Sequence, residues 1–165
     1  MYKLGEISFS DDADFFELDS DNPNINQGIL LRPTLYEFII QEALDFYSHE
    51  DQSTIKPQIA FEIEADSNVF DSISEFINWK PDTLDSDSCN YKTLKLYQKL
   101  LSFNKKENNE NSLIYNNIER IKWANKVAVG ADKKERYLSS LKQLYNEYPN
   151  NPYVADALYL IAEQY

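Results

Sequence analysis

Apolar residues recur with the period of an α-helix over most of the chain from residue 34 onward. They return every three or four positions, so each segment has an apolar face that can pack against a neighbour. Residues that end helices separate the segments, among them Pro81, Gly130 and the PNNP stretch at 149–152. Six helices are expected, at residues 34–50, 67–79, 91–103, 112–130, 132–148 and 152–165.

The first of these helices has a clear start. Thr34 and Glu37 follow Pro33 with the spacing of a capping box, in which each side chain satisfies a free backbone N–H group. The apolar positions that follow cover a broad stripe at helical spacing. They are Leu35, Phe38, Ile39, Leu44, Phe46 and Tyr47.

Residues 55–65 show a different pattern, in which apolar and polar positions alternate. Ile59, Phe61 and Ile63 fall on one side of an extended chain. The residues on the other side are Ala60, Glu62 and Glu64. This alternation predicts an extended strap or short β-strand, and residues 4–9 are a candidate for pairing with it.

Short turns join the predicted helices after residue 90. The segment 91–103 is apolar around much of its circumference, so it is expected to have neighbours on two sides. Ser112 is expected to cap the next helix, Gly130 to stop that helix, and Asp132 to open the one after it. Because the connections are short, successive helices are expected to pack antiparallel.

The last two helices resemble the boundary between two tetratricopeptide repeats. In that repeat, small and aromatic residues mark the first helix and a proline ends the second. The residues that fit the first helix are Leu158, Ile161, Ala162 and Tyr165, and those that fit the second are Tyr137, Leu141, Leu144 and Pro149. A small residue at Ala162 would let a partner helix come close. The match is partial, because PNNPYVAD inserts a few residues and the helix at 112–130 lacks the small residue and the tyrosine.

Several aromatic residues of this half admit two interpretations. They could line a concave groove for a peptide or a partner helix, or they could simply fill the core. The residues concerned are Tyr137, Tyr145, Tyr148 and Tyr153. A groove requires several of them to be exposed together on one face, so the structure can distinguish the two interpretations.

Composition supports a folded, acidic, mainly helical protein. The hydrophobic content of 42% suffices for a core, and only 3 glycines among 165 residues favour packed helices over a turn-rich sandwich. Sixteen basic residues against 28 acidic ones give a formal net charge of -12, which disfavours nucleic acid and anionic lipid as partners. Residues 1–32 are expected to form an acidic N-terminal arm, and residues 33–165 a helical, repeat-like domain whose last part, 90–165, resembles tetratricopeptide hairpins.

Residues that could carry chemistry are few and scattered. Cys89 is the only cysteine, which excludes an intrachain disulfide and a multi-cysteine zinc site. His49 is the only histidine, and its acidic neighbours indicate a surface residue at a helix end. The acidic runs at 19–24 and 82–88 depart from the pattern of a calcium loop, since the first lacks the glycine at the sixth position. We therefore expect no enzyme, no cofactor and no metal site.

A longer resemblance covers residues 32–165. The segment PTLYEF…ALDFY, followed by TLKLYQKLLSF and YLSSLKQLYNEYPNNPYVADALYLIAEQY, resembles the N-terminal helical region of large bacterial α-macroglobulin-like proteins of the Bacteroidetes type. The resemblance implies an exported, periplasmic or cell-envelope parent protein related to protease-trapping inhibitors. The thioester motif of that family is absent here, because Cys89 is followed by Asn90 and Tyr91.

These observations lead to two expectations about function. The first is a non-catalytic helical scaffold within a longer α-macroglobulin-like envelope protein, contacting other domains of that protein. The second is a stand-alone tetratricopeptide-like adaptor that binds a peptide or a partner protein. No export signal stands at the start of the sequence and no stretch is long and apolar enough for a membrane span, so membrane insertion by this segment is not expected.

Overall fold

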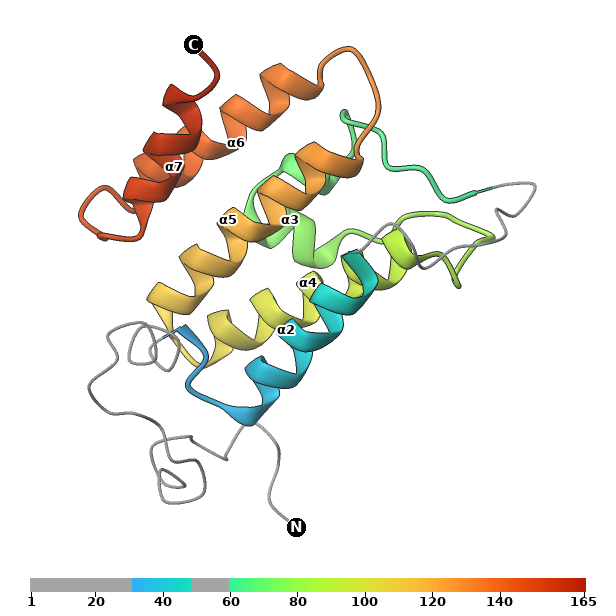
Figure 1. The fold of residues 1–165 in the computed structure, drawn as a ribbon, viewed down its shortest axis with the longest axis horizontal. Helices are drawn as coiled ribbons and strands as arrows, with labels where there is room; N and C mark the ends of the chain where they lie inside the picture. The colour runs from blue at the N-terminus through green and yellow to red at the C-terminus, as the bar shows by residue number, and fades with distance from the viewer. Residues whose placement is uncertain (1–30, 49–59) are drawn as a thin grey trace.

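The computed structural model describes residues 31–48 and 60–165, and all statements about structure below concern these residues. They form six α-helices and one short 3-10 helix and contain no β-strand, which confirms the all-α fold class (Figure 1). The elements are α2 (Leu35–Ser48), η3 (Asn68–Phe70), α3 (Ile73–Asn78), α4 (Cys89–Lys106), α5 (Glu110–Val127), α6 (Lys133–Glu147) and α7 (Val154–Ala162).

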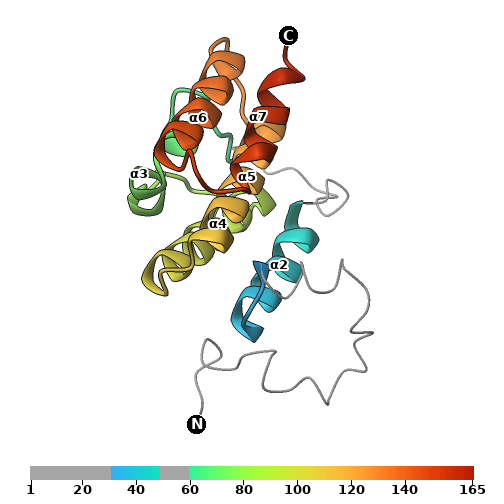
Figure 2. The same ribbon diagram turned by 90° about the vertical axis from the view of Figure 1, so that its left-hand side faces the viewer.

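The helices pack mainly against their neighbours in the chain. From α4 to α7 successive helices run in opposite directions, as the short connections require, and α7 also contacts α5. Helix α2 packs on α4 and lies at the opposite end of the helical body from α7 (Figures 1 and 2). Both α2 and α7 are therefore outer helices, with one face on the body and one face turned away from it.

The extended strap is present in the described residues from 60 onward. Phe61, Ile63 and Ala65 are buried and the residues between them are exposed, so the predicted alternation is confirmed. The strap forms a single parallel bridge with Val129, whose N–H donates to the Ile63 carbonyl at 2.9 Å. The expected pairing with residues 4–9 lies outside the described residues.

The prediction of a single helix at 67–79 is wrong, because the structure divides this segment into η3 and α3. Ser72 has extended backbone and caps α3 in a capping box with Glu75. The carbonyls of Val69 and Asp71 accept hydrogen bonds from the Arg120 guanidinium, and not from the N–H groups of a continuing helix. A buried arginine from a distant helix thus takes the acceptors that a single helix would have used.

Two predicted helix boundaries have different chemistry in the structure. The cap of α5 is Asn109, whose side chain accepts from the Ser112 N–H at 3.2 Å, so the expectation that Ser112 is the cap is wrong. The Ser112 hydroxyl is buried and donates to the Leu31 carbonyl at 3.1 Å.

Helix α5 ends before Gly130, which has a φ of 125° and passes close to Ala65. Asp132 precedes α6 as its N-cap residue, as expected, although its side chain makes no capping hydrogen bond.

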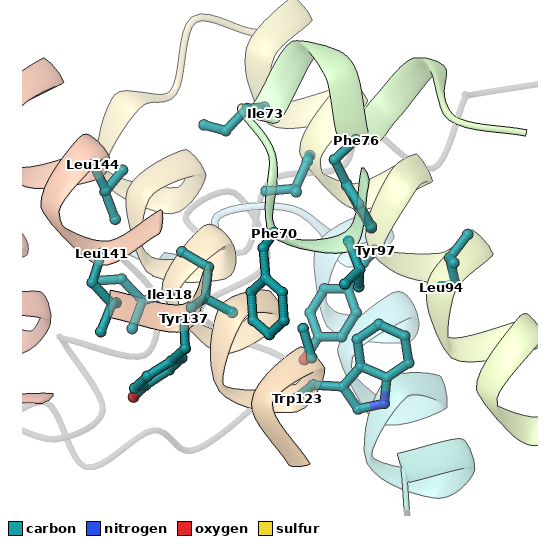
Figure 3. Packing of buried hydrophobic residues seen from close by; sticks show 14 of the residues in the cluster. Phe70, Ile73, Phe76, Leu94, Tyr97, Ile118, Trp123, Tyr137, Leu141 and Leu144 are labelled. Atoms are coloured by element: carbon teal, nitrogen blue, oxygen red, sulfur yellow. The ribbon is translucent and has the colours of Figure 1, made fainter. Parts of the chain in front are cut away.

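One hydrophobic core joins η3 and α3 to the long helices. Phe70 and Phe76 point from this segment into the core beside side chains of α4 and α5 (Figure 3). Tyr97 of α4 and Trp123 of α5 contact each other there, with ring centroids 5.5 Å apart. Buried residues from α4, α5 and α6 surround them, so the predicted two-sided burial of α4 is confirmed.

Candidate interaction surface

The inner face of α2 is held by a buried network of polar side chains. Glu37 is fully buried and accepts hydrogen bonds from the Thr34 N–H and hydroxyl, which confirms the predicted capping box. Its second oxygen accepts from the Asn104 amide of α4 at 2.5 Å. Asn104 in turn accepts from Asn116 of α5, and Asn116 accepts from Gln41 at 2.8 Å. This chain of hydrogen bonds fixes how α2 docks on α4 and α5.

Burial alters the acidity of the glutamate in this network. Loss of solvation raises the pKa of Glu37 above its usual range, and the hydrogen bonds from Thr34 and Asn104 oppose that rise. The desolvation of the buried carboxylate is thus unfavourable, and hydrogen-bond donors partly offset it. Its role in the structure is to connect helices, since its hydrogen bonds to other described residues run to Thr34 and Asn104, which position α2 and α4.

Arg120 holds the η3 segment from the other side of the core. Its guanidinium lies over the Phe76 ring at 4.6 Å and donates to the carbonyls of Val69 and Asp71. Burial lowers the pKa of Arg120 to about 9, while the charge of Asp71 opposes the fall, so the side chain is still cationic at neutral pH. Arg136 of α6 also binds Asp71, through its carboxylate. Two arginines therefore converge on one turn and fix it.

A shallow depression beside Arg120 is a poor candidate for a small-molecule site. Its cavity volume is about 10 Å³, whereas ligand pockets usually measure roughly 300–1,000 Å³. Its lining includes Asn117 and Ser140, and both Asn117 Oδ1 and Arg120 Nε have no hydrogen-bond partner among residues 31–48 and 60–165. The other nitrogens of Arg120 are engaged with backbone carbonyls, which leaves little of the guanidinium for a ligand.

Of the residues considered for catalysis or metal binding, the structure describes Cys89 and the 82–88 loop. Cys89 is half-buried at the start of α4, and His49 and residues 19–24 lie outside the described residues. In the 82–88 loop, Asp85 accepts from the Phe61 N–H at 3.1 Å, a contact that holds the strap. Within residues 31–48 and 60–165 no three His, Cys, Asp or Glu residues form a group that could hold a metal ion. None of the helices in these ranges combines the length and the apolarity needed to cross a membrane.

The four tyrosines proposed for a groove do not share an exposed face. Tyr137 is buried, Tyr148 and Tyr153 are half-buried and pack against the core, and Tyr145 alone of the four is exposed. Their burial agrees with the alternative interpretation, in which these residues fill the core.

The outer face of α2 carries much of the apolar stripe that the sequence suggested. Phe38 and Ile39 are 39% and 46% exposed, and Phe46 is 54% exposed. Of that stripe Leu44 is buried, and the remaining buried positions of α2 include Glu37 and Gln41. Part of the apolar stripe is therefore exposed, because Ile40, Leu44 and the polar network occupy the interface with the body.

Helix α7 also has large apolar side chains on its exposed face. Val154 and Ala157 are its buried residues, while Leu158 is 45% and Tyr159 65% exposed. Ala162, expected to lie at a close helix contact, is exposed. The repeat-like pattern therefore lies mostly on the face turned away from α5 and α6, where the described residues provide no neighbouring helix.

Sequence reasoning missed these two outer faces because periodicity locates an apolar stripe without saying what covers it. For α7 the signal was present, since the pattern Leu158, Ile161, Ala162, Tyr165 is the one that receives a partner helix in a tetratricopeptide repeat. We define the outer α7 face as Ala155, Leu158, Tyr159 and Ala162, with Tyr165 beyond the helix end.

Comparisons with known proteins identify no family. No family model, curated protein or solved structure matches the chain. The resemblance to α-macroglobulin-like proteins therefore remains a hypothesis that depends on the quoted segments of the sequence.

Proposed function

We propose that this chain is a non-catalytic helical scaffold that binds other protein segments through its outer helices. The observation that carries the proposal is the exposure of apolar side chains on α2 and α7, which lie at opposite ends of the body. Grouped apolar residues on a protein surface are typical of interaction sites. The buried polar groups support the same proposal, because Glu37 and Arg120 hold helices and turns together.

We further propose that the scaffold belongs to an α-macroglobulin-like protein of the bacterial envelope. This rests on the resemblance of residues 32–165, in which the PTLYEF…ALDFY segment corresponds to α2 and its cap. In that setting, the outer helices would hold neighbouring domains of the same protein in place. The alternative of a stand-alone adaptor with a tyrosine-lined groove has less support, since Tyr137 is buried and two of the other three tyrosines are half-buried.

Site-specific photo-cross-linking tests the scaffold proposal. A benzophenone amino acid is placed at Phe46 on α2, at Leu158 on α7, or at Leu84, which is 89% exposed in the loop before α4. The protein is expressed in the cells that naturally make it, and cross-linked products are identified by mass spectrometry. We expect defined protein adducts at Phe46 or Leu158 and none at Leu84. Absence of adducts at both outer helices would refute the scaffold.

The envelope context has a separate test. Fractionation of the producing cells should place the protein in the periplasm or cell envelope, and the surrounding coding sequence should encode macroglobulin-type domains in the same reading frame. A cytosolic protein encoded without such domains would refute the envelope context while leaving the cross-linking result to decide the scaffold.

A further inference from the structure

The outer α7 face has the shape of a helix-docking surface. Ala155, Leu158, Tyr159 and Ala162 follow one another at intervals of three or four residues, so they form one continuous stripe along the helix. The two alanines flank the two large side chains, which leaves low positions where another helix can approach closely. Val154 and Ala157 on the opposite side are buried against the body, so α7 is held firmly while this stripe stays exposed.

The charges beside the stripe determine which partner fits. Asp156 and Glu163 are exposed and seven residues apart, so they lie on the same flank of α7, next to Tyr159. No lysine or arginine occurs between residues 152 and 165. An approaching helix therefore meets apolar groups in the middle and carboxylates along one edge, and basic residues on its own edge would complement them.

A second copy of the chain fits this surface poorly. In a twofold antiparallel pairing centred near Tyr159, Asp156 of one copy would lie beside Glu163 of the other, twice over. Residues 152–165 themselves contain no cation, and the lysine beside them, Lys134 of α6, already donates to the Gln164 carbonyl at 3.2 Å, so pairing two α7 stripes brings mainly carboxylates together. The N-terminal residues 1–30 are equally unsuited in composition, with seven carboxylates and one lysine.

We propose that the outer α7 face binds an amphipathic helix with lysine or arginine along one edge of its apolar stripe. The proposal rests on the scaffold function above and specifies the chemistry of one partner. The interaction is helix against helix, with Leu158 and Tyr159 at the centre of the contact and the two carboxylates at its edge.

Two designed peptides test this inference on the full 165-residue chain. Both have about four helical turns and the same leucine and alanine face, and they differ in having lysine or glutamate along one edge. Binding is measured by fluorescence anisotropy at low salt. We expect the lysine peptide to bind and the glutamate peptide to bind at least about tenfold more weakly, since Asp156 and Glu163 attract lysine and repel glutamate.

Variants locate the binding site. Leu158→Glu should weaken the lysine peptide at least about tenfold, by removing an apolar contact and placing a charge in the stripe. Leu84→Glu makes the same change at another exposed leucine and should leave binding unchanged. Glu163→Lys introduces a cation at the C-terminal end of α7, where the helix dipole favours it, and should shift preference toward the glutamate peptide. Circular dichroism checks that each variant keeps the helical content of the parent.

Three results would overturn the inference. In the first, the lysine peptide does not bind the protein. In the second, the lysine peptide binds the Leu158→Glu variant as tightly as the parent protein. In the third, sedimentation shows that the parent protein is a dimer and that the Leu158→Glu variant is not. If cross-linking still captures a protein at Phe46, the scaffold survives and only the helix-docking inference falls. If neither experiment captures anything, both fall.

Discussion

Replacing Asn104 with leucine should destabilise the protein through its hydrogen bonds, although leucine is close in size and suits a buried helix position. Asn104 is fully buried in α4 and connects α2 to α5. Its amide donates to Glu37 at 2.5 Å, and its carbonyl accepts from Asn116 at 2.9 Å. The Asn104→Leu variant leaves a buried carboxylate oxygen and a buried amide without these partners.

The magnitude follows from the two lost contacts. A hydrogen bond to a charged group contributes roughly 1.5–3 kcal/mol and one between neutral groups roughly 0.5–1.5 kcal/mol. The expected loss in free energy of unfolding is therefore about 2–4 kcal/mol, a large part of the roughly 5–15 kcal/mol that stabilises a typical domain. With a urea slope of about 2 kcal/mol per molar, the midpoint should fall by roughly 1–2 M.

Urea unfolding followed by tryptophan fluorescence and circular dichroism provides the assay. Trp123 is buried in the core, so its emission reports the loss of packing. The matched control is Asn146→Leu at an exposed position of α6, where the change should be close to zero. A loss below about 1 kcal/mol for Asn104→Leu, or one equal to the control, would show that the network contributes little to stability.

Three further predictions concern other parts of the structure. Burial raises the pKa of Glu37, so protonation of this carboxyl group favours the folded state. This stabilisation is complete below the ordinary glutamate pKa and should be lost as pH rises through the raised pKa of the folded state. The free energy of unfolding of the wild-type protein should therefore fall relative to that of the Glu37→Gln variant as pH rises from about 4 to about 7. A constant difference between the two proteins in urea unfolding over this pH range would contradict the prediction. Arg120→Lys keeps the charge but loses the planar fork that serves Val69 and Asp71, and urea unfolding should show a loss of about 2–4 kcal/mol; a loss under about 1 kcal/mol would contradict it. Gly130→Ala places a side chain at a φ of 125° and should cost about 1–3 kcal/mol in thermal unfolding, so an unchanged melting temperature would refute the strain.

The helices themselves could be predicted because their signals are local. Capping boxes, prolines and short polar turns operate within a few residues, and they located α2, α4, α5, α6 and α7 to within several residues. The strap was also predictable, because alternation reports which side of an extended chain is buried. The break between η3 and α3 was missed, although Ser72 and Glu75 have the spacing of a capping box; the other contact that supports it comes from Arg120, which is 49 residues from Asp71 in the sequence.

The faces of the outer helices could not be read from periodicity. In α2 the packing face includes Glu37 and Gln41, whose partners Asn104 and Asn116 lie 67 and 75 residues away. No local rule predicts that a glutamate will be buried, because burial of a carboxylate is tolerated only where distant donors satisfy it. Phe38, Ile39 and Phe46 then remain on the outer face, which is why the candidate interaction surface emerged only with the structure.

Hydrogen exchange of the full chain with the lysine-edged peptide tests most directly whether the outer helices are where this protein binds others. We expect added protection at residues 154–165 and no change in the 82–88 loop, which contains Leu84. Protection centred on the depression beside Arg120, or no protection anywhere, would contradict it.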